Sequence, residues 1–154
     1  MTGLVVSPKK PLKLAFLFPG QAGTGVLNIN SLKVDKNLEN IVLKTYNALQ
    51  EAVEPPELAV AVLNGDPAVT RYNTQVAQLR SFLDSTIMWL AFMNSSPAHG
   101  TPTLGELTAD GHIQWQVSGH SLGGYVAANI LPPNTHLDDS MNEFKARVRR
   151  VSKR

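Results

Sequence analysis

Apolar residues follow different spacings along this chain, and each spacing predicts a different element. Residues 12–18 (LKLAFLF) form a short apolar run that Pro19-Gly20 ends, which predicts a buried strand entering a sharp turn. Residues 113–117 alternate apolar and polar side chains, as a second strand does. From Leu38 to Val53 apolar residues recur at helical spacings, which predicts an amphipathic helix that Asp35 or Asn37 caps and Pro55-Pro56 ends.

Further along the chain, a long helix is expected from Thr70 to Ser95. It is apolar over so wide an arc, with Met88, Trp89 and Phe92 extending the apolar face, that we expect it to pack inside, against a sheet. The other expected segments are a short apolar stretch at 58–63, a loop at 95–111, a helix at 125–131 and a last helix from about Asp138 to the end of the chain.

Ser121 lies where the second strand meets the next helix, inside Gly119-His120-Ser121-Leu122-Gly123. In a Gly-x-Ser-x-Gly turn the serine hydroxyl is exposed at the edge of the sheet, and the glycines avoid collisions with the adjacent strand and helix. The helix start adds free amides that stabilise an oxyanion. This pattern predicts a nucleophilic serine; the alternative is a glycine-rich connection whose serine only caps a helix.

Two further segments, together with the Ser121 motif, indicate which class of reaction the serine would carry out. Phe18-Pro19-Gly20-Gln21 ends the first strand, Asn73-Thr74-Gln75 opens the long helix, and Gly119-His120-Ser121-Leu122-Gly123 is followed by Tyr125. In their order and rough spacing these segments resemble the malonyl-CoA:acyl carrier protein transacylase family and the related acyltransferase domains of fatty acid and polyketide synthases. The resemblance covers about residues 12–130.

The resemblance implies an α/β fold, with part of an α/β-hydrolase-like core, a mainly parallel sheet and a strand–nucleophile–helix elbow. Ser121 would be the nucleophile, and the backbone amides of Gln21 and Leu122 would form the oxyanion hole. Supporting positions in the motifs are Gly20, Gly119, His120 and Gly123. The acyl group would pass from a coenzyme A thioester, as substrate, to an acyl carrier protein, with no metal and no further cofactor.

An arginine on the helix after the elbow holds the malonyl carboxylate in family members of that specificity. Aligning residues 144–154 by their phenylalanine and valines puts Arg154 at this position. A guanidinium pairs well with a carboxylate. The alternative is that Arg154 is one more solvated charge on a basic helix.

The general base is the weak point of the resemblance. The family's histidine lies well downstream, whereas here His99 and His112 precede the elbow in loop-like sequence, His120 adjoins the serine, and only His136 follows it. We therefore expect residues 12–154 to be the N-terminal part of a truncated or split acyltransferase domain behind a flexible leader, 1–11. A complementary chain would then carry the histidine, and the isolated chain would be slow or inactive.

Departures from the family pattern keep two other functions open. Ala22-Gly23-Thr24 differs from the family's usual continuation of the first motif, and Gly124 replaces its usual glutamate. Gly-His-Ser-Leu-Gly-Gly also occurs in α/β-hydrolase esterases and lipases, so such an enzyme is the first alternative. The second is a non-catalytic remnant that binds acyl-CoA or a partner chain.

Composition and charge fit a folded protein. The hydrophobic content is 43%, there is no cysteine, and the net charge of +2 comes from the last ten residues, which hold six basic residues and no acid. We expect a solvated helix face there rather than a nucleic-acid site.

The longest apolar run, 87–93, is far short of the about 20 residues of a membrane span, so we expect a cytoplasmic protein without a membrane partner.

Overall fold

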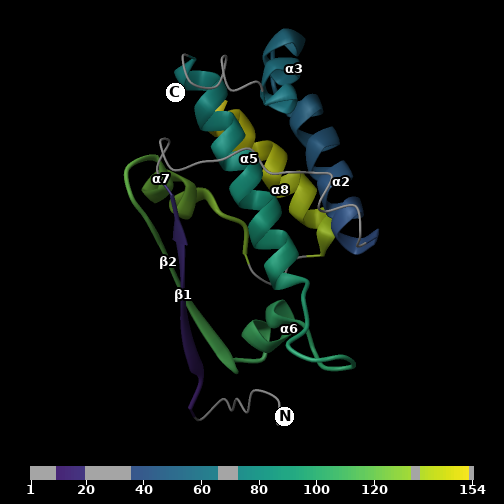
Figure 1. Ribbon diagram of the computed structural model, residues 1–154, viewed down its shortest axis with the longest axis vertical. Coiled ribbons are helices and arrows are strands. Elements are labelled where there is room, and N and C mark those ends of the chain that lie inside the picture. The colour runs from purple at the N-terminus through teal and green to yellow at the C-terminus, as the bar shows by residue number, and fades with distance from the viewer. Residues whose placement is uncertain (1–9, 20–35, 66–72, 133–135, 153–154) are drawn as a thin grey trace.

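The computed structural model describes residues 10–19, 36–65, 73–132 and 136–152. Over these residues the chain is mixed α/β and mostly helical, with a two-stranded parallel sheet (Figure 1). Gly20, Gln21, Arg154 and the first nine residues of the expected leader lie outside the described residues.

The sheet consists of β1 (Leu12–Phe18) and β2 (Ile113–Gly119), as the two apolar patterns predict. The strands pair in parallel, with Leu12 opposite Ile113 and Phe18 opposite Gly119. Both strands therefore end at the same edge, and the residues that follow them start side by side.

Helix α5 (Thr74–Met93) covers one face of this sheet, and no other described helix or strand covers the opposite face (Figure 1). Alternate side chains of both strands point to α5 and form an aromatic cluster: the Trp89 ring lies 5.2 Å from Phe16 and 5.6 Å from Trp115, edge on in both cases. The expected packing of this helix against a sheet is confirmed. Trp89 is buried as expected, but Met88 and Phe92 are about half exposed.

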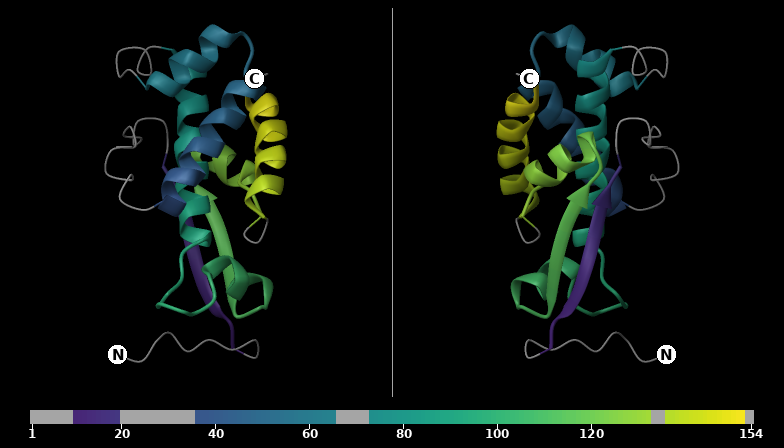
Figure 2. Two further views of the ribbon diagram at one scale, coloured as in Figure 1. Left: turned by 90° about the vertical axis from the view of Figure 1, so that its right-hand side faces the viewer. Right: turned by 90° about the vertical axis from the view of Figure 1, so that its left-hand side faces the viewer.

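The rest of the core is helical and lies above the strands in both views of Figure 2. The stacked rings of Phe82 and Phe144, 5.6 Å apart, join α5 to the C-terminal helix. Arg80 ties α5 to its neighbours, because its guanidinium donates to the Asp84 carboxylate and to the carbonyl oxygens of Val62 and Leu63 at 3.0–3.1 Å. The helices in this part, besides α5, are α2 (Lys36–Ala52), α3 (Pro56–Asn64) and α8 (Leu137–Ser152).

One expected segment is wrong in type, and another, whose type the pattern leaves open, is a helix. Residues 95–111 include helix α6 (Leu104–Ala109), which the Thr103 hydroxyl caps by accepting from Glu106 N at 3.1 Å. A threonine three residues before a glutamate is a capping signal, and the nearby Pro, Gly and Thr residues obscured it. The apolar stretch at 58–63 lies within α3, whose first residue is proline, a favoured first helical residue.

Other boundaries shift by a few residues. Helix α2 begins at Lys36, so Asn37 lies inside it and is not its cap, and Asp35 is outside the described residues. Helix α5 begins at Thr74 with Asn73 as the cap, which agrees with the expected opening motif. Helix α7 (Leu122–Asn129) begins three residues earlier than expected, directly after Ser121.

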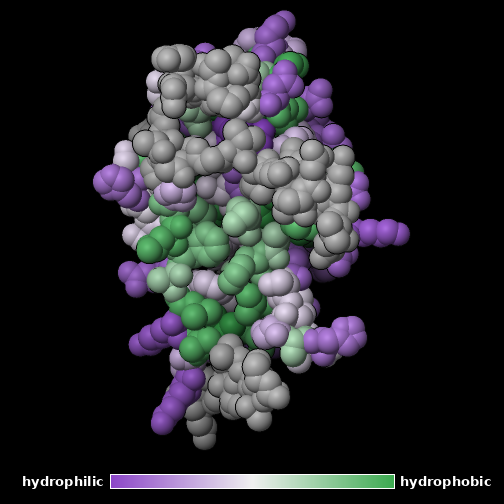
Figure 3. All heavy atoms as spheres, in the orientation of Figure 1, coloured by the Kyte–Doolittle hydropathy of each residue, from purple (hydrophilic) through white to green (hydrophobic). Residues whose placement is uncertain are grey.

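Apolar surface gathers where β1 and α5 face the viewer in Figure 3. The large apolar side chains exposed on these two elements are Leu17 at 72%, Met88 at 52% and Phe92 at 45%. Among the helices that the structure describes, none is long and apolar enough to cross a membrane.

Candidate active site at Ser121

Ser121 occupies the turn between β2 and α7 with an unusual backbone conformation. Its φ of 54° and ψ of −118° make it the one non-glycine residue with positive φ in the described part of the chain. Such a conformation costs roughly 1–3 kcal/mol, and the surrounding structure must enforce it. The side chain is exposed and makes no capping hydrogen bond to α7. Ser121 thus stands at the N-cap position of α7 without capping it through its side chain.

Two glycines allow the tight packing that enforces this turn. A Cβ on Gly119 would lie 2.1 Å from the carbonyl carbon of Gly123, and a Cβ on Gly123 would lie 2.1 Å from the carbonyl oxygen of Phe18. No side chain fits in either place, because the obstructing atoms belong to the backbone. The end of β1, the end of β2 and the first turn of α7 are thus in direct contact.

In the first turn of α7, two amides donate to backbone carbonyls, and that of Leu122 does not within the described residues. Gly123 N donates to His120 O at 2.9 Å and Gly124 N donates to Ser121 O at 3.0 Å, which closes the turn. Leu122 N has no acceptor among the described residues, and it lies at the positive end of the helix dipole next to Ser121. The structure therefore leaves this amide free to donate to an anionic oxygen.

The end of β1 reaches the same place. His120 N donates to Phe18 O at 3.4 Å, and a Cβ on Gly123 would lie 2.7 Å from Pro19 O. The chain thus leaves β1 beside the first turn of α7. Gln21, the other predicted oxyanion donor, follows two residues after Pro19 but lies outside the described residues.

No histidine is paired with Ser121, although all four histidines are described. His112 precedes β2, and the seven residues of this strand separate it from the elbow by about 20 Å. His99 lies in the connection between α5 and α6, and its side chain is exposed. His120 and His136 are exposed too, and no hydrogen bond joins either of them to Ser121 in the described parts.

His112 is not the solvent-exposed loop residue that its sequence setting suggests. It is half-buried, and its Nδ1 is buried without a hydrogen-bond partner among the described residues. Its backbone joins α6 to the sheet, because its N donates to Leu107 O and its O accepts from Leu12 N, both at 2.9 Å.

The basic C-terminal helix is not simply a solvated face. Lys145 pairs with Glu51, Arg147 pairs with Glu143, and Arg150 donates to the Asn129 side chain. Arg149 is exposed, and no described side chain pairs with it. Arg154, the predicted carboxylate ligand, lies outside the described residues.

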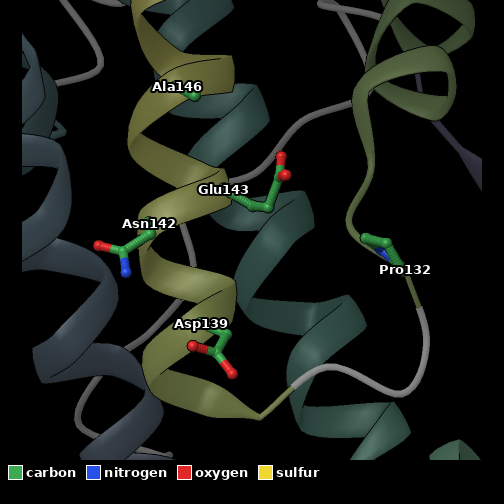
Figure 4. Close-up of a pocket in the computed structure, with 5 residues that line it drawn as sticks. All are labelled: Pro132, Asp139, Asn142, Glu143 and Ala146. Atoms are coloured by element: carbon green, nitrogen blue, oxygen red, sulfur yellow. The ribbon is translucent and has the colours of Figure 1, made fainter.

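A hollow on the surface lies apart from Ser121, between α8 and the segment that follows α7 (Figure 4). Its carboxylates, Asp139 and Glu143, disfavour the anionic groups of a malonyl thioester. None of the predicted site residues lines it; the lining residues are Pro132, Asp139, Asn142, Glu143 and Ala146.

Comparisons of this chain with protein-family models, with curated proteins and with solved structures found no match.

Proposed function

We propose that this chain carries the nucleophilic half of an acyltransferase site, in which Ser121 takes up an acyl group from a coenzyme A thioester. The observation that carries the proposal is the strained, exposed Ser121 between two glycines that backbone contacts require. A non-glycine residue in this conformation is strained, and such strain is concentrated at active sites. We propose that the fold is the part of an α/β-hydrolase-like core that contains the nucleophile elbow.

In the proposed reaction Ser121 Oγ attacks the thioester carbonyl, and its proton passes to a base. The Leu122 amide, with that of Gln21, stabilises the oxyanion; one such donor is worth about 3 kcal/mol in the transition state. The C–S bond then breaks and coenzyme A leaves as the thiol. A carrier-protein thiol attacks the acyl-serine in turn, which forms a new thioester and restores the Ser121 hydroxyl. Malonyl is the proposed acyl group, with Arg154 as its carboxylate ligand.

The base is proposed to come from a complementary polypeptide, because none of the described histidine side chains is hydrogen-bonded to Ser121. One face of the sheet is covered by no described element, and Leu17 is exposed on it; both support such a partner, since parallel sheets are ordinarily covered on both faces. The isolated chain should then acylate slowly. Sustained turnover by the purified chain alone would contradict the need for an external base.

An esterase remains the second candidate, because the elbow geometry and Gly124 suit ester hydrolysis equally well. The two are separated by incubating the chain with malonyl-CoA, acetyl-CoA or p-nitrophenyl acetate, each with and without a carrier protein bearing its phosphopantetheine thiol. A transferase should load the carrier and release little free acid. An esterase should release p-nitrophenol and free acid at the same rate with or without the carrier.

A further inference from the structure

The C-terminal end of α7 is held by arginines of α8. Arg147 Nη1 donates to the carbonyl oxygen of Asn129 at 2.8 Å and also to that of Ile130, and Arg150 Nη1 donates to Asn129 Oδ1 at 3.3 Å. These carbonyls end the helix and lack partners within it. A guanidinium there supplies both the hydrogen bonds and a positive charge at the negative end of the dipole.

Helix α7 needs outside support to stay formed. It has only eight residues, two of which are Gly123 and Gly124. Isolated helices of this length are unstable in water, and each glycine lowers helix propensity further. The helix must nevertheless hold Ser121 in a strained conformation at its first turn.

A third contact fixes the segment just beyond α7. Trp89 Nε1 donates to Leu131 O at 2.8 Å, and both residues are buried. Helix α7 is thus fixed at one end by the glycine contacts with β1 and β2, and at the other end by α8 and α5.

We propose that Arg147, with Arg150 in support, is a positioning residue for Ser121. Its guanidinium keeps the whole of α7 helical and in place, so that the first turn cannot unwind and release the strained serine. The effect of Arg147 on acyl transfer rests on the function proposed above, whereas its effect on the stability of α7 does not. These two arginines would then support the site from within the fold.

The test is hydrogen exchange, because it reads the first turn directly. The amides of Gly123 and Gly124 close the turn at Ser121 and lie about 8–9 Å along the helix from Asn129, which Arg147 contacts. Arg147→Ala should speed exchange of these amides about ten-fold or more, the effect of losing a charge-assisted hydrogen bond. Arg147→Lys keeps the charge and should show a smaller increase.

Arg149→Ala is the matched control, since it removes the same charge from the same helix at an exposed position without a described partner. Faster exchange confined to residues 127–131, or equal first-turn exchange in Arg147→Ala and Arg149→Ala, would overturn the proposal. If Arg147→Ala does not fold, Arg147→Lys and Arg150→Ala, which each remove part of the contact, carry the same comparison.

Acylation supplies a separate readout. If wild type forms an acyl-serine, Arg147→Ala should slow acylation about ten-fold at saturating thioester, with little change in KM, because the arginine acts on Ser121 and not on the substrate. If wild type forms no adduct, the proposed function fails, and the exchange data still decide whether Arg147 positions the turn.

Discussion

Gly123 offers the sharpest test of the elbow geometry. In Gly123→Ala the new Cβ would lie 2.1 Å from Phe18 O and 2.7 Å from Pro19 O, far inside van der Waals contact and against backbone on both sides. Neither side can move without separating β1 from α7. Overpacking of this kind costs about 1–3 kcal/mol or more, and we expect the upper end because no flexible side chain can yield.

Gly124 is the matched control one residue further. A Cβ there would lie 3.3 Å from Gly119 O, so that a shift of a few tenths of an ångström relieves the contact. Alanine also favours a helix over glycine by up to about 1 kcal/mol. Gly124→Ala should therefore change the free energy of unfolding by less than about 1 kcal/mol in either direction.

Urea unfolding followed by circular dichroism measures the difference. With a slope of about 2 kcal/mol per molar, a loss of about 3 kcal/mol lowers the midpoint of Gly123→Ala by roughly 1.5 M, whereas that of Gly124→Ala should move by less than about 0.5 M. Equal midpoints for the two variants would refute the close approach of β1 to α7, and with it the structural reason for the strained serine.

Three further predictions concern the rest of the fold. Arg80→Ala should lower the free energy of unfolding by about 3–5 kcal/mol, because it breaks a buried ion pair with Asp84 and removes donors from two carbonyls of α3; a loss in urea unfolding no larger than that of Arg149→Ala would contradict this. Thr103→Ala should cost about 1 kcal/mol by removing the cap of α6, and Thr103→Ser should restore it, as measured by thermal unfolding. Burial raises the pKa of Tyr46 above its usual value of 10.0 despite the nearby Arg80, so its hydroxyl stabilises the folded state fully below pH 10 and loses this effect as the pH rises through the raised pKa. Tyr46→Phe should remove late-titrating tyrosinate absorbance, and an unchanged late part of the titration curve in this variant would count against the assignment.

The sequence patterns predicted the elements that surround Ser121 because the information there is local. Alternation predicted β2, the Pro-Gly pair ended β1, and the glycines on either side of Ser121 predicted a tight turn, which the structure confirms. Helix α6 was missed because its capping pair, Thr103 and Glu106, stands among residues typical of loops. A short helix of this kind depends on its cap more than on a hydrophobic pattern.

The tertiary role of charged residues could not be read from spacing. Residues 145–152 look like a solvated basic face, yet Arg147 and Arg150 reach the end of α7, about twenty residues earlier in the chain. Similarly, no periodicity indicates that Arg80, which lies in α5, donates to the last carbonyl oxygens of α3. Such partners are chosen by the packing of helices, which the spacing of residues along one helix does not encode.

The most direct test of the central claim is the mass of the intact chain after incubation with malonyl-CoA, followed by peptide mapping. We expect an added malonyl group on Ser121 that is absent in Ser121→Ala and retained in Ser118→Ala, a control that removes another exposed serine hydroxyl at the end of β2. A malonyl group that persists in Ser121→Ala would contradict Ser121 as the nucleophile. The absence of any adduct with malonyl-CoA, acetyl-CoA or an activated ester would contradict the acyl-serine site itself.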